Sequence, residues 1–292
     1  MKLSFRADEP RRPAYELLAE KGVSRLLVKR IRLYGQLLVN GLPARMKDAP
    51  VPGDLVEAIY LDDHTDFTLR PDHGIRICYE DPWLLVCEKP AGLVTHPSWQ
   101  HMDDSLIQRL SEKRLHPVTR LDRETSGLIL IAKNGFSHHA LAFSGMVKKY
   151  IAFVYGEFSP KKGTIDAPIE RSGTSIMLRE VREDGKRAVT HYETLGAEER
   201  SGLSRVLFTL ETGRCHQIRV HCLHSGHPIV ADGLYGVRSV AYPAPKIRGI
   251  ENEEKIDRQA LHAAYLSFIH PIFREELVFE SPLPEDMKKL EN

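Results

Sequence analysis

The spacing of apolar residues predicts two helices at the start of the chain. The first covers residues 13–21 and stops at Gly22. The second follows Ser24, a good N-cap residue, and ends at Gly35. Its core stripe should consist of four residues at helical spacing, namely Val23, Leu27, Ile31 and Tyr34. A short strand with an Asn-Gly turn at 40–41, and a second turn and strand over 51–56, complete this segment.

The rest of the chain carries the shorter apolar runs that are typical of strands. A polar stretch separates the two parts and predicts a linker over residues 63–74. Strands are expected at 75–79, 83–88, 128–132, 148–156, 188–193, 205–211, 261–268 and 276–280. Helical patterns cover 105–113 and 137–146, and shorter helices are expected within 212–228 and 282–287. Residues 237–256 hold prolines and charges without periodicity, which predicts a loop insertion or flap.

Charge is spread unevenly along the 292 residues. The formal net charge is only +1, yet residues 1–60 hold eleven Lys and Arg against seven Asp and Glu. Three of these cations, Arg25, Lys29 and Arg32, recur at helical spacing on one face of the second helix. A row of cations on one face is suited to a repeating anion, so we expect these residues to contact the phosphates of a nucleic acid. The alternative is the solvated face of an ordinary helix.

Four cysteines and the absence of long apolar runs limit the cellular setting. No apolar run approaches the roughly 20 residues that a membrane span needs, and no secretory segment stands at the start. We therefore expect a cytoplasmic protein with reduced thiols and no membrane partner. Cys78 and Cys87 flank a predicted hairpin, so a disulfide between them is the alternative.

One carboxylate stands out beside a strand-like apolar run. Asp122 lies between Arg120 and Arg123, and a Thr-Ser-Gly turn then leads into residues 128–132. Cationic neighbours favour the charged form of a carboxylate, which makes Asp122 available as a nucleophile or base. Lys149 and Tyr150 open a later strand and form a cation-aromatic pair suited to a phosphate and a base. The alternative for Tyr150 is an edge-strand tyrosine without a functional role.

Histidines and cysteines gather between Cys215 and His227, but their pattern does not predict a metal site. The stretch has no C-x-x-C pair, and several of these side chains would point apart on a helix, whereas zinc ligands converge. The signature of zinc deaminases is also missing. No glycine-rich phosphate loop or dinucleotide fingerprint occurs, so no metal and no nucleotide cofactor are expected.

Taken in order, four motifs resemble those of the RluA-type RNA pseudouridine synthases. The resemblance covers about residues 75–285, and Leu261-His262-Ala263 fits the family's late strand. The four motifs are Glu88-Lys89-Pro90-Ala91-Gly92-Leu93, Thr119 to Leu128, Lys149-Tyr150-Ile151-Ala152, and Thr212 to His221 continuing to Gly226-His227-Pro228-Ile229. Three positions depart from the usual pattern: Thr119 replaces a usual His, Cys215 a usual Thr or Ser, and Ala231 a usual Gly.

The resemblance implies a role for each matching residue. Asp122 is similar to the essential catalytic aspartate, and Arg219 to the arginine that pairs with it. Tyr150 is similar to the active-site tyrosine that packs against the uracil, and Arg120 to the residue that displaces the target base. Lys149, Arg214 and His216 would contact RNA.

The fold implied is α+β, with a mixed, mainly antiparallel sheet and a central active-site cleft. The N-terminal helices and turns resemble an S4-like RNA-binding domain, which is a common companion in this family. The expected division is an S4-like domain over residues 1–62, a linker over 63–74 and a catalytic domain over 75–292, in a monomeric protein.

The activity implied is the isomerisation of particular uridines in structured RNA to pseudouridine, with ribosomal RNA preferred over transfer RNA as substrate. Asp122 could attack C1′, add to C6 of the uracil or remove the C2′ proton, and the sequence leaves all three open. Two other functions also stay open. One is a non-catalytic RNA-binding or ribosome-assembly protein on the same fold, and the other is a carboxylate-based nucleoside or glycoside hydrolase.

Overall fold

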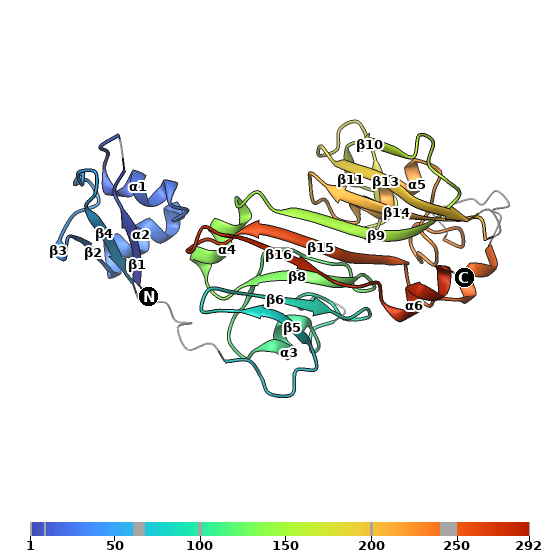
Figure 1. The fold of residues 1–292 in the computed structure, drawn as a ribbon, viewed down its shortest axis with the longest axis horizontal. Helices are drawn as coiled ribbons and strands as arrows, with labels where there is room; N and C mark the ends of the chain where they lie inside the picture. The colour runs from blue at the N-terminus through green and yellow to red at the C-terminus, as the bar shows by residue number, and fades with distance from the viewer. Residues whose placement is uncertain are drawn as a thin grey trace.

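The computed structural model describes residues 2–8, 10–60, 68–98, 101–198, 201–239 and 250–291. These residues form a four-stranded sheet, a ten-stranded sheet and a two-stranded ribbon. Figure 1 shows the small sheet, in blue, beside one end of the large sheet, which runs through the rest of the molecule. We call residues 2–60 the N-terminal module and the remainder from residue 68 the large module.

The N-terminal module packs two helices on one antiparallel sheet with the strand order β1-β4-β2-β3. Its core joins helix residues such as Leu17 and Leu27 to sheet residues such as Leu3 and Val56. The hydroxyl of Ser24 accepts a hydrogen bond from the Leu27 amide at 3.2 Å, which confirms the predicted N-cap. The elements are β1 (Lys2–Arg6), α1 (Ala14–Glu20), α2 (Arg25–Tyr34), β2 (Gln36–Val39), β3 (Leu42–Pro43) and β4 (Leu55–Ile59).

Two features of the N-terminal module differ from the sequence prediction. Tyr34 does not join the core stripe, because its side chain is 78% exposed at the last turn of α2. Ile31 already closes the stripe there, and the chain leaves the helix at Gly35. The strand β1 was not predicted, although Leu3 and Phe5 alternate with polar residues and β1 pairs with β4.

The large sheet is mixed and mainly antiparallel, as predicted. Its strand order is β10-β13-β14-β9-β15-β8-β6-β5, with β16 added on β15 and β7 on β8. Among the named strands of the described residues, only β8 and β15 pair in parallel. The strands are β5 (Arg76–Glu80), β6 (Leu84–Lys89), β7 (His116–Pro117), β8 (Ser126–Ala132), β9 (Val147–Tyr155), β10 (Lys162–Asp166), β13 (Val189–Glu198), β14 (Leu203–Leu210), β15 (Leu261–Ile269) and β16 (Glu276–Glu280).

Short helices and a ribbon surround this sheet (Figure 1). The ribbon joins β11 (Ile169–Arg171) and β12 (Arg179–Val181), and α5 packs near it. All seven residues of β8 are buried, which confirms the predicted buried strand. The remaining elements are α3 (Leu106–Leu110), α4 (Gly135–Ala142), α5 (Gln217–His224), η1 (Ile250–Glu254), α6 (Glu285–Lys288) and η2 (Lys289–Glu291).

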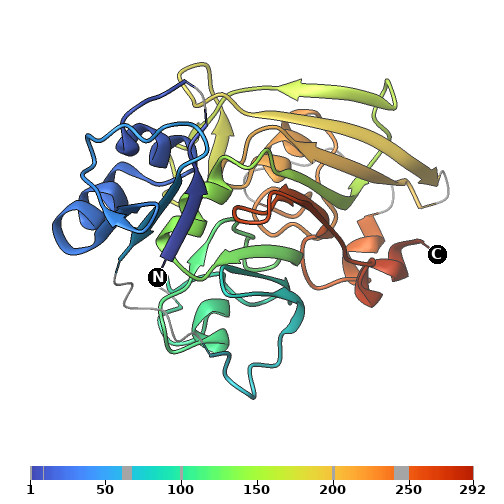
Figure 2. The same cartoon turned by 60° about the vertical axis from the view of Figure 1, so that its left-hand side comes forward.

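Helix α4 joins the two modules through apolar packing. Phe136 is 1% exposed and belongs to the core of the N-terminal module, and its ring meets Trp83 edge-on at 5.9 Å. A Cβ added to Gly22 would lie 3.1 Å from the Cβ of Ala140, so the backbone of the N-terminal module approaches the helix closely. Figure 2 brings this side of the molecule forward and shows the N-terminal module against the large one.

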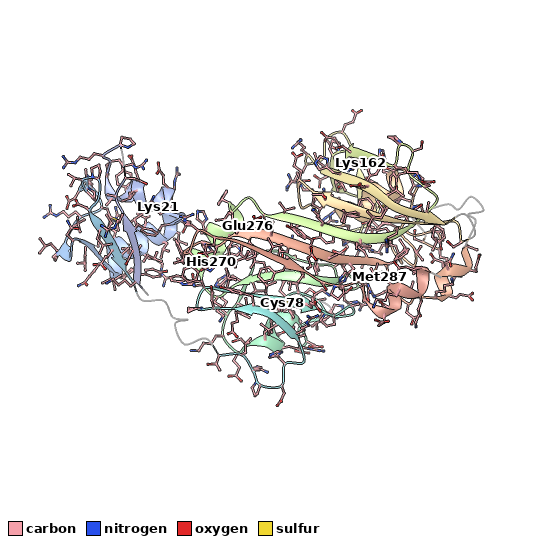
Figure 3. All side chains as sticks on the ribbon, in the orientation of Figure 1. Lys21, Cys78, Lys162, His270, Glu276 and Met287 are labelled. Atoms are coloured by element: carbon pink, nitrogen blue, oxygen red, sulfur yellow. The ribbon has the colours of Figure 1, made fainter. Side chains whose placement is uncertain are left out.

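A buried histidine ties two edges of the large sheet together. His270 lies in the turn between β15 and β16, and its Nε2 lies 2.7 Å from Asp81 in the turn between β5 and β6. Figure 3 labels His270 at this end of the sheet and Cys78 on β5. Cys78 and Cys87 are free thiols, so the alternative of a disulfide between them is not realised.

Parts of two predicted connections lie outside the described residues, namely 63–67 of the linker and 240–249 of the loop. The described part of that loop includes the 3₁₀ helix η1, whose Glu253 accepts a hydrogen bond from the Tyr155 hydroxyl at 2.8 Å. No helix in the described part of the chain is long and apolar enough to cross a membrane.

Candidate active site

A cleft of about 920 Å³ opens on the large module where four segments meet. The segments are the loop over residues 94–98, the loop before β8, the connection from α4 to β9, and the turn that leads into α5. Five basic side chains and two acidic ones line it: Arg120, Arg123, Lys148, Arg214 and Arg219, with Asp122 and Glu211. The cleft is therefore strongly positive in a chain that is nearly neutral, which suits a polyanionic substrate.

Asp122 reaches this cleft from a loop over residues 119–125, the Asp122 loop. Its backbone carbonyl accepts a hydrogen bond from the Thr125 amide at 3.1 Å, which closes a tight turn. The hydroxyl of Thr95 bonds both backbone groups of Leu121, at 3.1 and 3.3 Å. The buried Lys89 ammonium donates to the carbonyl of Arg123 at 2.9 Å. These bonds fix the backbone on both sides of the carboxylate.

Gly127 lets the Asp122 loop enter the sheet. Its φ of +113° is disfavoured for other residues, and a Cβ there would lie 2.3 Å from the carbonyl oxygen of Ala263. Strand β8 can therefore approach β15 closely just after the loop. The hydroxyl of Ser126 also lies 2.9 Å from Nδ1 of His262 in β15, which holds the same junction.

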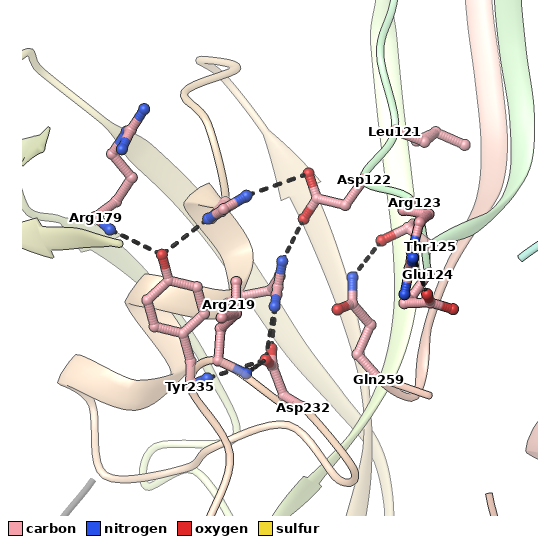
Figure 4. A network of polar contacts seen from close by, with 12 residues as sticks. Leu121, Asp122, Arg123, Glu124, Thr125, Arg179, Arg219, Asp232, Tyr235 and Gln259 are labelled. Carbon is pink, nitrogen blue, oxygen red and sulfur yellow. Dashed lines mark hydrogen bonds and ion pairs between the residues drawn. The ribbon is translucent and has the colours of Figure 1, made fainter. Parts of the chain in front are cut away.

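Arg219 joins Asp122 to a second, fully buried carboxylate. Its Nη1 donates to Oδ2 of Asp122 at 2.8 Å, while its Nε and Nη2 donate to the two oxygens of Asp232 at 2.7 Å each (Figure 4). The side chain of Asp232 is 0% exposed, that of Arg219 5% and that of Asp122 27%. Burial opposes the charge of Arg219, but the hydrogen bonds and charges of Asp232 and Asp122 outweigh it and raise the pKa of Arg219.

His216 faces the other oxygen of Asp122. Its Nε2 lies 3.9 Å from Oδ1, and its Nδ1 lies 2.8 Å from the hydroxyl of Tyr235. That hydroxyl already accepts the Arg179 amide at 2.8 Å, so its own hydrogen is available for Nδ1. We therefore assign the hydrogen of a neutral imidazole to Nε2, on the side of Asp122. Burial lowers the pKa of His216 despite the nearby charge of Asp122, which favours the neutral ring.

The backbone at His216 is itself unusual. His216 has φ +58° immediately before α5, in the left-handed region that most side chains avoid. This conformation begins α5 with its N-terminus in the cleft, and Ile218 and Arg219 follow inside the helix as predicted. A strained residue at a cleft is consistent with a functional position.

Lys149 and Tyr150 point to opposite faces of strand β9. Tyr150 is 8% exposed and lines the cleft, and burial together with the charge of Asp122 raises the pKa of its phenol, which therefore stays protonated. Lys149 points to the other face, with its Nζ 4.7 Å from the centre of the Tyr265 ring. The cleft is lined instead by Lys148, which strand alternation places on the same face as Tyr150.

The remaining predicted residues fall into two groups. Arg120 and Arg214 line the cleft that contains Asp122 and are exposed. Arg25, Lys29 and Arg32 line a separate groove of about 1100 Å³ between α2 and the β2–β3 hairpin. Arg45 and Lys47 add two cations to this groove, and Glu16 is its single acidic residue. Arg45 and Lys47 were not predicted, because the loop that holds them has no periodicity.

Asp232 and Tyr235 were also not predicted as site residues. They lie in the turn after α5, where Oδ1 of Asp232 accepts the amides of Leu234 and Tyr235 at 2.9 and 3.0 Å. The cysteines and histidines of residues 215–227 do not converge: Cys215 is exposed in the cleft, while His221 is buried against Thr190 and Ala167. Among the described residues, no cluster of three potential metal ligands occurs.

Comparisons with known proteins agree with this geometry. The sequence profile of a family described as RNA pseudouridylate synthase matches residues 83–224. The chain is 37% identical over 289 residues to the "Uncharacterized RNA pseudouridine synthase YjbO" of Bacillus subtilis, covering 94% of this chain and 96% of that protein. It is 37% identical over 264 residues to the "Ribosomal large subunit pseudouridine synthase D" of Pseudomonas aeruginosa, covering 86% and 82%.

A solved structure supports the same fold. "Human RNA Pseudouridylate Synthase Domain Containing 1" superposes with a TM-score of 0.56 and 27% identity, over 71% of this chain and 83% of that one. The matched profile contains the Asp122 loop, Tyr150 and Arg219, but it begins after the N-terminal module.

Proposed function

This chain belongs to the RluA-type RNA pseudouridine synthases, and from that premise we propose that it isomerises particular uridines in structured RNA, with Asp122 as the catalytic carboxylate. Ribosomal RNA is the preferred substrate class and transfer RNA the second. The observation that carries the proposal is the Asp122–Arg219 pair, which lies in a positive cleft that Tyr150 also lines.

The reaction requires a positioned anion and little else. The bond from N1 of the uracil to C1′ breaks, the base turns, a bond forms from C5 to C1′, and the proton on C5 leaves while N1 gains one. Arg219 orients the carboxylate of Asp122 through Oδ2 and leaves Oδ1 directed toward the cleft. An oxygen in that position could attack C1′, add to C6 or take the C2′ proton.

The target uridine must also leave its stack, which costs a few kcal/mol. Arg120 is exposed on the wall of the cleft and is suited to fill the vacated place. The buried ring of Tyr150 offers an apolar surface to the turned base. Arg214, His216 and Lys148 line the same cleft and are suited to hold the flanking backbone. Lys149, on the far face of β9, is not placed for this task.

The N-terminal module supports a large RNA substrate. The groove beside α2 carries five basic residues against one acidic residue, away from the catalytic cleft, which matches the S4-like RNA-binding role. We infer that residues 1–62 form this RNA-binding domain, 63–74 the linker and 75–292 the catalytic domain. Two basic surfaces on one chain favour structured RNA over a short single strand.

Tritium release from uridine labelled at C5 tests the catalytic assignment. An in vitro ribosomal RNA transcript with this label should release tritium with the parent enzyme but not with Asp122→Asn, while RNA binding persists. Asp184→Asn is the matched control, because it makes the same change at a carboxylate that pairs with Arg182 at 2.6 Å and does not line the cleft. Turnover by Asp122→Asn close to that of the parent would refute the role of Asp122. Release of free uracil would instead indicate a hydrolase, and binding without any release a non-catalytic protein.

The groove is tested by salt dependence. Replacing Arg25, Lys29 and Arg32 together by Gln should flatten the plot of log affinity against log salt by about one for each lost phosphate contact. Arg30→Gln is the control, since Arg30 is exposed on the same helix but does not line the groove. A triple variant with the parent's salt slope would discard the RNA-binding role. Point variants are preferable to truncation, because removing the N-terminal module would uncover Phe136.

A further inference from the structure

Phe143 exposes its ring at the rim of the catalytic cleft. It is the residue that ends helix α4, and 78% of its surface is exposed. Four aromatic side chains are strongly exposed in the described residues, namely Tyr15, Tyr34, Phe143 and Phe273. Of these, Phe143 alone lines the cleft that contains Asp122. A single exposed apolar ring is common on protein surfaces, so it is the place of Phe143 in the lining of the cleft that distinguishes it.

The backbone around Phe143 is well fixed. The Phe143 amide bonds the carbonyl of Ala140 at 3.3 Å, and Ser144 bonds the carbonyl of Leu141 through its amide at 3.2 Å and its hydroxyl at 2.8 Å. Gly145 then turns the chain with φ +67° toward strand β9. The ring of His139, one helical turn earlier, meets the Phe143 ring edge-on at 5.2 Å. The exposed face is thus presented from a rigid helix end.

Charge near Phe143 matches the backbone of a nucleic acid. Lys148 follows in the same wall of the cleft, and its Nζ approaches the opposite wall, 3.5 Å from where a Cβ on Gly213 would lie. Arg214 and Arg120 line the cleft as well. An aromatic face beside several cations is the arrangement that binds successive nucleotides, with the base on the ring and the phosphates on the cations.

We propose that Phe143 is a stacking platform for a nucleobase next to the flipped uridine in the RNA substrate. The proposal rests on the proposed function, because it assigns a neighbour to the uridine that Asp122 would act on. Stacking tolerates any base, so Phe143 contributes to affinity and placement of the RNA rather than to choice of sequence. Phe143 acts on binding and is not a catalytic residue.

The test compares variants of Phe143 on the C5-tritiated ribosomal RNA transcript. Phe143→Ala should lower kcat/KM by about 5- to 100-fold, mainly through KM, as expected for the loss of one stacked base. Phe143→Trp should stay within about threefold of the parent because it retains an aromatic face. Phe143→Leu should behave like Phe143→Ala, since it is apolar without a flat π-surface. All three should unfold like the parent, because the ring is exposed.

Phe273→Ala is the matched control. Phe273 is 57% exposed in the turn between β15 and β16, outside the cleft, so this variant should keep the parent's kcat/KM. The proposal is overturned if Phe143→Ala retains kcat/KM within twofold, or if Phe143→Leu equals Phe143→Trp. Either result leaves the proposed function intact when the parent releases tritium. If the parent releases none, the proposed function fails. The affinity of the same variants for the same transcript, measured by filter binding, then tests the stacking role of Phe143 separately.

Discussion

Asp232 holds Arg219 with both carboxylate oxygens at 2.7 Å, and the same guanidinium then reaches Asp122 at 2.8 Å. A single buried cation is thus shared between a carboxylate with no exposed surface and one that faces the cleft. The fully buried partner fixes the plane of the guanidinium. Asp232 is therefore a positioning residue that acts on Asp122 through Arg219.

Asp232→Asn should reduce both stability and activity. Loss of one partner of a buried charge pair destabilises a protein by about 3 kcal/mol, and the freed guanidinium no longer holds Asp122 in one orientation. We expect kcat to fall by roughly 100-fold, comparable to the loss of one preorganised contact in an active site. Urea unfolding and tritium release measure the two effects.

Glu80→Gln, which disturbs the buried Lys133 away from the cleft, should lower stability while kcat stays unchanged. Equal kcat for Asp232→Asn and the parent would limit Asp232 to folding.

Tyr235→Phe should loosen His216 with little effect on the fold. The variant removes the hydroxyl between Nδ1 of His216 and the Arg179 amide but keeps the ring beside Arg219, 5.0 Å away. One hydrogen bond of about 1 kcal/mol predicts a loss of several-fold in kcat. Nitrogen NMR of the imidazole should show hydrogen on Nε2 in the parent and a mixture of tautomers in the variant. Tyr155→Phe removes a comparable hydrogen bond from a hydroxyl to Glu253, and it should change neither kcat nor the tautomer of His216. A pure Nε2–H tautomer in Tyr235→Phe contradicts the assignment.

His262 should make the fold sensitive to acid. It is buried between Ser126 and Ser281, and burial lowers its pKa to about 4 from an ordinary value of 6.5. Between pH 6.5 and 4 the unfolded chain binds a proton there and the folded protein does not, so stability falls as the pH falls. The full effect is roughly 3 kcal/mol. When unfolding is measured across this window, the stability of His262→Gln should fall less steeply with falling pH than that of the parent. If the free energy of unfolding falls equally with pH in His262→Gln and in the parent, His262 does not cause the loss of stability in acid.

Ala231→Gly should stabilise the protein. Ala231 has φ +54°, and the left-handed region costs a residue with a Cβ roughly 1–2 kcal/mol. Part of this gain is lost because glycine is more flexible in the unfolded chain, so a net increase of up to about 1 kcal/mol is expected in urea unfolding. Ala19→Gly, at an exposed position in α1, should change stability by a similar amount in the opposite direction. A loss of stability in Ala231→Gly would show that the strain is relieved by other contacts.

Much of the fold followed from local pattern. The N-cap at Ser24, the Asn-Gly turn and the buried strand β8 were predictable, because each depends on residues adjacent in the sequence. Tyr34 was assigned to the core wrongly, since helical spacing does not show where the partner surface ends. Strand alternation separates Lys148 from Lys149, and applying it to β9 would have placed Lys148 in the cleft.

The site itself was only partly predictable. Asp122 and Tyr150 were singled out from their sequence neighbours and Arg219 from the family resemblance. The structure places all three at one cleft although 97 positions separate Asp122 from Arg219. Asp232 and Tyr235 gave no such signal, because they act through a turn that folds back on α5. Phe143 escaped notice because an apolar residue at the end of a helix is expected to be buried. Only tertiary packing decides which apolar residues remain in solvent.

Helix α4 has a consequence for how the enzyme selects its target. It anchors the N-terminal module through Phe136 at one end and presents Phe143 to the catalytic cleft at the other. Seven residues of helix span about 10 Å, and a helix changes its length little. The helix therefore constrains the separation between the groove and the cleft, the two surfaces proposed to contact RNA. An RNA bound in the groove would be modified where one of its uridines lies at the matching distance from the groove. This fixed separation would therefore help to select the uridine.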